Sequence, residues 1–493
     1  MASENSYKSI LKGTSMFGGV QVFQILINWA RGKCVAVLLG PEGMGIASLF
    51  TSASNTVQKF ASLGLNLAIV REMADNSRDP DSISRFIGLS IRILAATSLL
   101  SALICILFAR PLSRVTFGST DMSWQFMLLG IAVGFGIAGT GILSILQGLH
   151  EVKRLSKASI VGGLTGLFIG VPLYYLYGTA GIVPAMIALS VAMFIFYYFS
   201  LRKSVVYEPL KGFAREHASV IKRMIGMGII LMASDLIGTS VTYGINIFIH
   251  TLASDIEVGL YQAANSATAQ YSGMVFTAMA MDYFPRLTKA SNDRSLMHAI
   301  VNRQTEIVAL IIAPAACLLI ITAPLVIQIL FTREYDPILP LMRWMGLGIT
   351  LRALMMPMGY ITFAKDNKKA FFALEGLFGN LLTLALSCIG FYFFGLIGLG
   401  YAFLADNALC LLVYYVVNRR LYGYRFTCEA LKGIAYATLI TVACFLFSLL
   451  HEAIFSYSLM AISCTIATVW GVTNLRNKLK SSDDSEGHDD QQI

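Results

Sequence analysis

Six basic side chains lie within stretches that are otherwise long and apolar enough to cross a lipid bilayer. They are Arg31, Lys33, Lys59, Arg92, Arg343 and Arg352. A cation at membrane depth costs from about 2.5 to more than 10 kcal/mol, so such residues usually face a water-filled interior and handle anionic groups. The six positions therefore predict a hydrated cavity that receives a negatively charged ligand.

A regular polar pattern leads up to the first of these cations. Gln21, Gln24, Asn28 and Arg31 recur at helical spacing, which places them on one helical face. We expect Gln24, Asn28 and Arg31 to line the cavity. Lys33 points away from this face, so its ammonium either joins the cavity or extends toward the membrane interface.

Two further stretches carry a full charge within a polar face. One face holds Asn55, Lys59, Ser62 and Asn66, and the other holds Asp235, Thr239, Thr242 and Asn246. Amides and hydroxyls also join helices to one another, but a charge within the face favours contact with water. We expect Lys59, Arg92 and Arg352 to bind the anionic ligand. Arg343 lies near the outer end of its stretch and can extend to the interface instead.

Asp235 and Asp406 are the acidic residues placed deepest in apolar stretches. A carboxylate at this depth can exchange a proton or bind Na⁺ during a transport cycle. The alternative is a structural ion pair with one of the cations. We expect these two residues to couple transport to an ion, and the sequence leaves that alternative open.

The composition excludes a soluble globular protein. Hydrophobic residues make up 56% of the 493 residues, charged residues only 13%, and the mean hydropathy is +0.68, whereas soluble domains carry about 25% charged residues. Apolar stretches near the ~20 residues that span a bilayer recur along the chain. We expect an all-α polytopic membrane protein with about fourteen transmembrane helices, over residues 13–39, 44–70, 84–109, 122–147, 156–177, 180–201, 222–250, 256–284, 302–331, 337–363, 369–394, 396–418, 430–450 and 453–473.

The distribution of Lys and Arg gives an orientation. Basic residues concentrate on alternate connecting segments, while the other segments hold only Arg110, Arg114 and Arg333. Because basic segments stay in the cytoplasm during insertion, both termini are expected there. The net charge of +9 then reflects topology and not nucleic-acid binding. No pattern of a removable signal peptide is seen at the N-terminus.

A faint internal repeat suggests how the helices are grouped. Met44-Gly45-Ile46 is echoed 214 residues later by Val258-Gly259-Leu260, each just after a short acidic turn. We expect two six-helix bundles in a parallel pseudo-repeat. The expected parts are a first bundle over 1–205, a second over 216–425, an extra transmembrane hairpin over 428–475 and a disordered cytoplasmic tail over 476–493.

Several kinds of chemistry have no support in the sequence. The eight cysteines include no CxxC pair, and the histidines lack a partner at ligand spacing, so neither a disulfide framework nor a metal site is expected. A phosphate-binding Gly-x-x-x-x-Gly-Lys-Ser/Thr loop is missing. We therefore expect no cofactor and no ATP hydrolysis by this chain.

Two segments carry a resemblance to a known family. The turn in Lys33-Cys-Val-Ala-Val-Leu-Leu-Gly-Pro-Glu-Gly-Met-Gly45, and Val258-Gly-Leu-Tyr-Gln-Ala-Ala-Asn265 continuing to Asp282-Tyr-Phe-Pro-Arg286, resemble the O-antigen flippase family known as Wzx. This family belongs to the multidrug/oligosaccharidyl-lipid/polysaccharide exporter superfamily. The resemblance adds weight to Arg31 and Lys33, because such flippases carry basic residues in the matching first helix.

The resemblance implies a flippase for an undecaprenyl-diphosphate-linked oligosaccharide, working by alternating access through the cationic cavity of a bacterial inner-membrane protein. Implied partners are the lipid-linked oligosaccharide, membrane lipids, H⁺ or Na⁺, and other membrane proteins of polysaccharide assembly. The extra hairpin also resembles the fourteen-helix lipid II flippases. Two other functions stay open: a cation-coupled multidrug exporter, which the intramembrane cations disfavour, and a polysaccharide polymerase or ligase, which the short outer loops disfavour.

Overall fold

The computed structural model describes residues 2–62, 64–75, 80–149, 151–205, 215–450 and 452–489. These residues are almost entirely helical, and they contain no β-strand. The expected all-α class is therefore confirmed. The basic segment expected to link two bundles lies largely outside the described residues.

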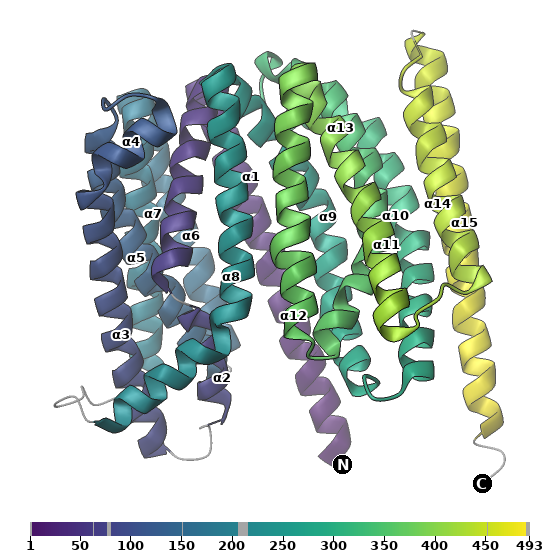
Figure 1. Cartoon of the computed structure of the whole chain (residues 1–493), viewed down its shortest axis with the longest axis horizontal. Coiled ribbons are helices and arrows are strands. Elements are labelled where there is room, and N and C mark those ends of the chain that lie inside the picture. Colours follow the sequence, from purple (N-terminus) through teal and green to yellow (C-terminus); the bar gives the residue numbers. More distant parts are fainter. Residues whose placement is uncertain are drawn as a thin grey trace. The chain divides into compact units, whose positions relative to one another are not determined.

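The chain forms two compact units. In Figure 1 the colours follow the sequence, from purple at the N-terminus to yellow at the C-terminus. Unit 1 comprises residues 1–259 with 330–332, and unit 2 comprises 260–329 with 333–493. The helices that begin in unit 1 are α1 (Ala2–Ser62), α2 (Leu65–Asp75), α3 (Pro80–Leu107), α4 (Ala109–Phe117), α5 (Ser123–Gly148), α6 (Val152–Tyr177), α7 (Ile182–Ser204), α8 (Arg215–Leu252) and α9 (Asp255–Lys289). Those of unit 2 are α10 (Arg294–Leu330), α11 (Leu339–Ala364), α12 (Lys368–Phe371), α13 (Asn380–Tyr422), α14 (Cys428–Phe447) and α15 (Ala453–Asp489).

Nine helical stretches among the described residues are long and apolar enough to cross a membrane. Three of them contain a sharp break and so cover two crossings each: α1 at Gly40, the α6–α7 pair at the short helix Gly178–Gly181, and α13 at Gly395. Gly40 and Gly395 have φ of 66° and 60°, a conformation that glycine adopts without strain. Because three of the nine stretches cross twice, they account for twelve crossings. The helices α8 and α9, with 38 and 35 residues, are long enough to add two more, which gives the expected number of about fourteen.

One expected crossing ends earlier than the hydropathy suggested. The stretch 44–70 is interrupted after Ser62, and Gly64 there has φ of 71°. Asn66 therefore belongs to α2 and does not continue the helical face of Lys59. The tail expected to be disordered begins within α15, which is helical as far as Asp489.

The two echoing glycine motifs contact each other within unit 1. A Cβ atom added to Gly45 would lie 1.8 Å from the Asp255 carbonyl oxygen, and one added to Gly259 would lie 1.8 Å from the Pro41 carbonyl oxygen. Each carbonyl belongs to the residue four positions before the opposing glycine, so the contact is the same in both directions.

In unit 2, the extra hairpin α14–α15 packs against α10 and α11. Their shared core includes Cys317 of α10, Leu354 of α11, Cys444 of α14 and Met460 of α15. Asn302 of α10 fixes the segment that enters the hairpin, because its Oδ1 accepts hydrogen bonds from the Tyr424 hydroxyl at 3.2 Å and the Thr427 amide at 3.1 Å. The hairpin is thus an integral part of unit 2.

Candidate functional site

Parts of two neighbouring helices of unit 1 have polar residues at their exposed positions. From residue 41 to 59 of α1 they are Glu42, Thr51 and Asn55, and from 232 to 251 of α8 they are Asp235, Ser240, Thr242 and Thr251. The contrast within the same unit is α3, where every exposed residue from 93 to 107 is Ala, Leu or Ile. Hydrocarbon tolerates the second pattern, whereas the carboxylates and the amide of the first pattern are costly in it. We call these exposed polar residues of α1 and α8, together with Lys59 and Thr239, the polar face of unit 1.

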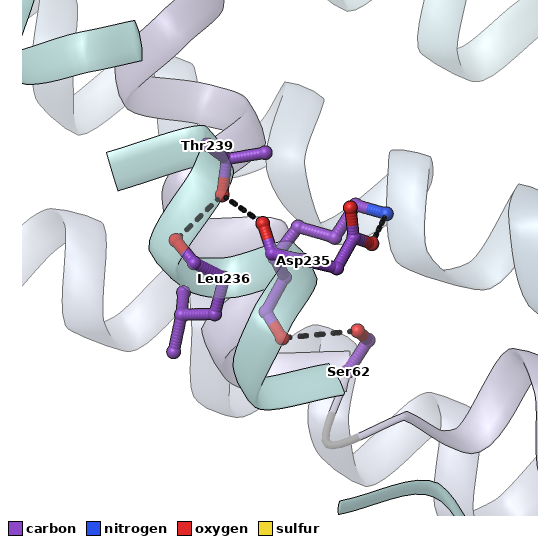
Figure 2. A network of polar contacts seen from close by, with 5 residues as sticks. Ser62, Asp235, Leu236 and Thr239 are labelled. Atoms are coloured by element: carbon purple, nitrogen blue, oxygen red, sulfur yellow. Dashed lines mark hydrogen bonds and ion pairs between the residues drawn. The ribbon is translucent and has the colours of Figure 1, made fainter. Parts of the chain in front are cut away.

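An ion pair lies on this polar face. The Lys59 ammonium on α1 contacts the Asp235 carboxylate on α8, although 176 residues separate them in the sequence. The two side chains are 44% and 55% exposed, so the pair is open to its surroundings. Figure 2 shows the local network, in which the Thr239 hydroxyl donates to the Asp235 carbonyl at 3.1 Å and the Ser62 hydroxyl donates to the Lys59 carbonyl at 3.2 Å.

A second set of contacts holds α1 and α8 together away from the exposed pair. The Asn246 side-chain amide is buried and donates to the hydroxyls of Ser48 at 3.2 Å and Ser52 at 2.8 Å. The Thr56 hydroxyl donates to the Thr239 carbonyl at 3.5 Å. The alternative interpretation of the sequence, in which amide side chains join helices, is therefore correct for Asn246. The ion pair is therefore one of several contacts between the two helices.

The earlier cations of the chain are distributed differently. Gln24 and Arg31 are half-buried, while Asn28 and Lys33 are exposed on the first half of α1. Arg31 interacts electrostatically with Tyr174 of α6. Arg31 thus interacts with a residue of α6, whereas Lys59 contacts α8. Arg92 is exposed on α3.

Unit 2 brings a cation and two carboxylates together. Between residues 341 and 362 of α11, Arg352 is the single exposed residue. It interacts electrostatically with both Asp406 on α13 and Glu375 on the π-helix Phe372–Gly379. The Thr383 hydroxyl donates to the Asp406 carboxylate at 3.0 Å.

The sequence did not predict that Glu375 belongs to this cluster. The Tyr414 hydroxyl hydrogen-bonds to its carboxylate. Gly359 of α11 leaves room for this carboxylate, since a Cβ atom there would lie 3.2 Å from Glu375 Oε1. A signal existed, because Asp406, Cys410 and Tyr414 recur every four residues and form one polar face of α13. The π-helix that positions Glu375 has no such signal, and π-helical turns are often found at functional sites.

Arg343, the remaining intramembrane cation, contacts the α14–α15 hairpin and not a group of carboxylates. Its guanidinium donates to the Ser448 carbonyl at 2.8 Å, at the end of α14, and hydrogen-bonds to Tyr457 of α15. Arg343 therefore attaches α11 to the hairpin. Among the described residues, no group of three or more His, Cys, Asp or Glu side chains is arranged to hold a metal ion.

Comparison with known proteins agrees with this architecture. Residues 34–340 match the family described as "Polysaccharide biosynthesis protein". The chain belongs to this family. Among its curated relatives are the lipid III flippases of Escherichia coli (strain K12) and Shigella flexneri. Each is 24% identical over 360 residues, which cover 70% of this chain and 82% of the relative.

Solved structures of the MOP superfamily share the fold of this family member. The lipid II flippase MurJ, in an inward closed conformation, aligns with a TM-score of 0.71 at 14% identity, covering 94% of this chain and 99% of MurJ. An inward-facing multidrug resistance MATE family transporter aligns with a TM-score of 0.70 at 16% identity, covering 81% and 94%. The chain is therefore a multi-pass membrane protein with the fold of MOP transporters.

Proposed function

We propose that this protein is a flippase that moves an undecaprenyl-diphosphate-linked oligosaccharide across the bacterial inner membrane by alternating access. The repeat unit of O-antigen or of another surface polysaccharide is its cargo. The family membership and the names of the two flippase relatives support this class of substrate. In this orientation both termini are cytoplasmic, and the partners are membrane lipids and other proteins of polysaccharide assembly.

The main structural support is that residues 41–59 of α1, 232–251 of α8 and 341–362 of α11 expose only polar or charged side chains. Lys59 lies on the polar face of unit 1, and Arg352 is exposed on α11 in unit 2. A diphosphate and acidic sugars require such groups in a hydrated cavity. Arg31, Lys33 and Arg92, with Gln24 and Asn28, complete the proposed substrate-binding set.

The cluster around Arg352 provides a site for ion coupling. Asp406 and Glu375 both interact electrostatically with Arg352 there. A proton or Na⁺ that binds one of these carboxylates in one conformation and leaves in the other would bias the equilibrium between the two conformations. Asp406 is the proposed acceptor of the ion. Asp235, the other carboxylate expected in this role, is paired with Lys59 and has a different proposed role below.

The competing functions are less well supported. A multidrug exporter for organic cations needs acidic groups that are free of basic partners, whereas Asp235 contacts Lys59, and Asp406 and Glu375 interact with Arg352. A polymerase or ligase needs an outer domain that gathers the glycan, and the described segments between crossings are short. A lipid II-type substrate has one specific observation in its favour, because the alignment with MurJ covers 94% of this chain. The two lipid substrates share the diphosphate that the cations would bind.

The experiment is leaflet accessibility of a fluorescent lipid-linked oligosaccharide in proteoliposomes. The wild-type protein should move the lipid between leaflets, and the variant combining Arg31→Ala with Arg352→Ala should lose at least about tenfold in rate, as expected for charged contacts to a diphosphate. Arg110→Ala, which removes an exposed arginine on α4, is the matched control and should flip at the native rate. Native flipping by the double variant would contradict the proposal. Ethidium efflux or glycan polymerisation by the purified protein would support the competing functions.

A further inference from the structure

We propose that Asp235 is an internal counter-anion that occupies Lys59 in the empty protein and is displaced by the phosphate groups of the cargo. This inference rests on the proposed function, and it gives Asp235 a role in cargo release in place of ion coupling. It is supported by the ion pair itself, its exposure and the contacts around it.

The Lys59–Asp235 pair is accessible. Both side chains are about half-exposed, on a face whose other exposed residues are polar. Ion pairs in contact with water contribute little net stability, because water solvates both charges well. A diphosphate carries more negative charge than one carboxylate, and it can therefore replace Asp235 beside the ammonium.

Contacts other than the ion pair also hold α1 and α8 together. Asn246 joins α8 to Ser48 and Ser52 of α1 on the buried side, and Thr56 joins α1 to the Thr239 carbonyl. Opening the ion pair leaves these contacts unchanged. Lys59 has a flexible four-carbon stem, so its ammonium can move to a new anion while the backbone remains in place.

Asp235 also affects release of the cargo. A cation that bound the diphosphate with no competitor would bind tightly, and tight binding slows dissociation. With Asp235 beside it, Lys59 has an anionic partner both before and after transport. Asp235 repels the bound diphosphate and re-forms the pair as the cargo leaves. Competition between two anions for one ammonium therefore favours turnover over tight binding.

Binding of farnesyl diphosphate, a short prenyl diphosphate, to the purified full-length protein in detergent micelles tests this exchange by calorimetry. Asp235→Asn removes the competing charge and should bind about tenfold more tightly than the wild type. Lys59→Met should bind more weakly, and the double variant should match Lys59→Met. Asp235→Glu retains the competing charge and should bind like the wild type. Asp121→Asn, which removes an exposed acid between α4 and α5, controls for the general loss of negative charge.

The flipping assay provides the second half of the test. Asp235→Asn should flip more slowly than the wild type despite its tighter binding. Equal or weaker diphosphate binding by Asp235→Asn, native binding by Lys59→Met, or an Asp235→Asn variant that does not fold would each overturn the inference, the last because a pair needed for folding is not exchangeable. These results are distinct from a failure of the proposed function, in which the wild-type protein itself does not flip the lipid-linked oligosaccharide.

Discussion

Arg343 and Arg352 are both arginines of α11, yet their surroundings differ. Arg343 is half-buried and hydrogen-bonds to Ser448 and Tyr457 of the hairpin, whereas Arg352 is exposed near two carboxylates. The sequence placed both within an apolar stretch and could separate them only by their depth. Their partners belong to α13, α14 and α15 and become visible only in the folded chain. The same limit applies to Lys59, whose partner Asp235 was assigned a separate role.

This difference predicts opposite phenotypes for one substitution. Arg343→Met removes a charge-assisted hydrogen bond and should lower stability by about 1 to 2 kcal/mol, with flipping by the folded protein near the native rate. Arg352→Met should leave thermal stability nearly unchanged and reduce flipping. Thermal unfolding in detergent and the proteoliposome assay measure the two effects. Loss of stability in Arg352→Met with native flipping would reverse the assignment.

Asp406 gives a prediction about the driving ion. Asp406→Asn keeps the acceptor for Thr383 but removes the charge that a proton or Na⁺ would neutralise. Flipping by the wild type should respond to an imposed H⁺ or Na⁺ gradient, and flipping by Asp406→Asn should not. A variant that keeps the full gradient response would show that the coupling carboxylate lies elsewhere.

At the scale of helices, hydropathy and periodicity predicted most of the structure. Long apolar stretches identify crossings because the bilayer fixes their length, and the Gly-Pro sequence at 40 and 41 marked the first turn. The interruption after Ser62 and the π-helix Phe372–Gly379 were not predicted. Both are local departures from α-helical geometry within apolar sequence, and hydropathy does not distinguish such departures from regular helix.

The reciprocal glycine contact predicts that two substitutions in α1 will differ sharply. Gly45→Ala places a methyl group where the Asp255 carbonyl lies, so we expect a destabilisation of about 1 to 3 kcal/mol. Gly32→Ala is the matched control, since nothing lies within 4 Å of its Cβ position, and it should stabilise the helix by about 0.5 to 1 kcal/mol. Unfolding midpoints in detergent compare the two. Equal midpoints would show that the crossing relaxes without cost.

At the scale of the whole molecule, the class of protein followed from composition alone, because an excess of apolar residues has no stable place in water. Neither composition nor periodicity predicted which polar side chains are available for binding or ion coupling and which pack between helices. Asn246 and Asp235 fall on the same helical stripe of the sequence, yet one is buried between helices and the other is exposed. That distinction depends on which neighbour each side of the helix meets.

The proposed function requires that the polar face of unit 1 be in contact with water within the membrane. Its most direct test uses single cysteines at Thr51, Asn55 and Thr242, introduced into a protein whose eight native cysteines are replaced, with Leu103→Cys on α3 as the lipid-facing control. In proteoliposomes, a membrane-impermeant methanethiosulfonate should modify the first three rapidly and Leu103→Cys slowly. Equal, slow modification at all four positions would contradict a hydrated cavity and with it the proposed function.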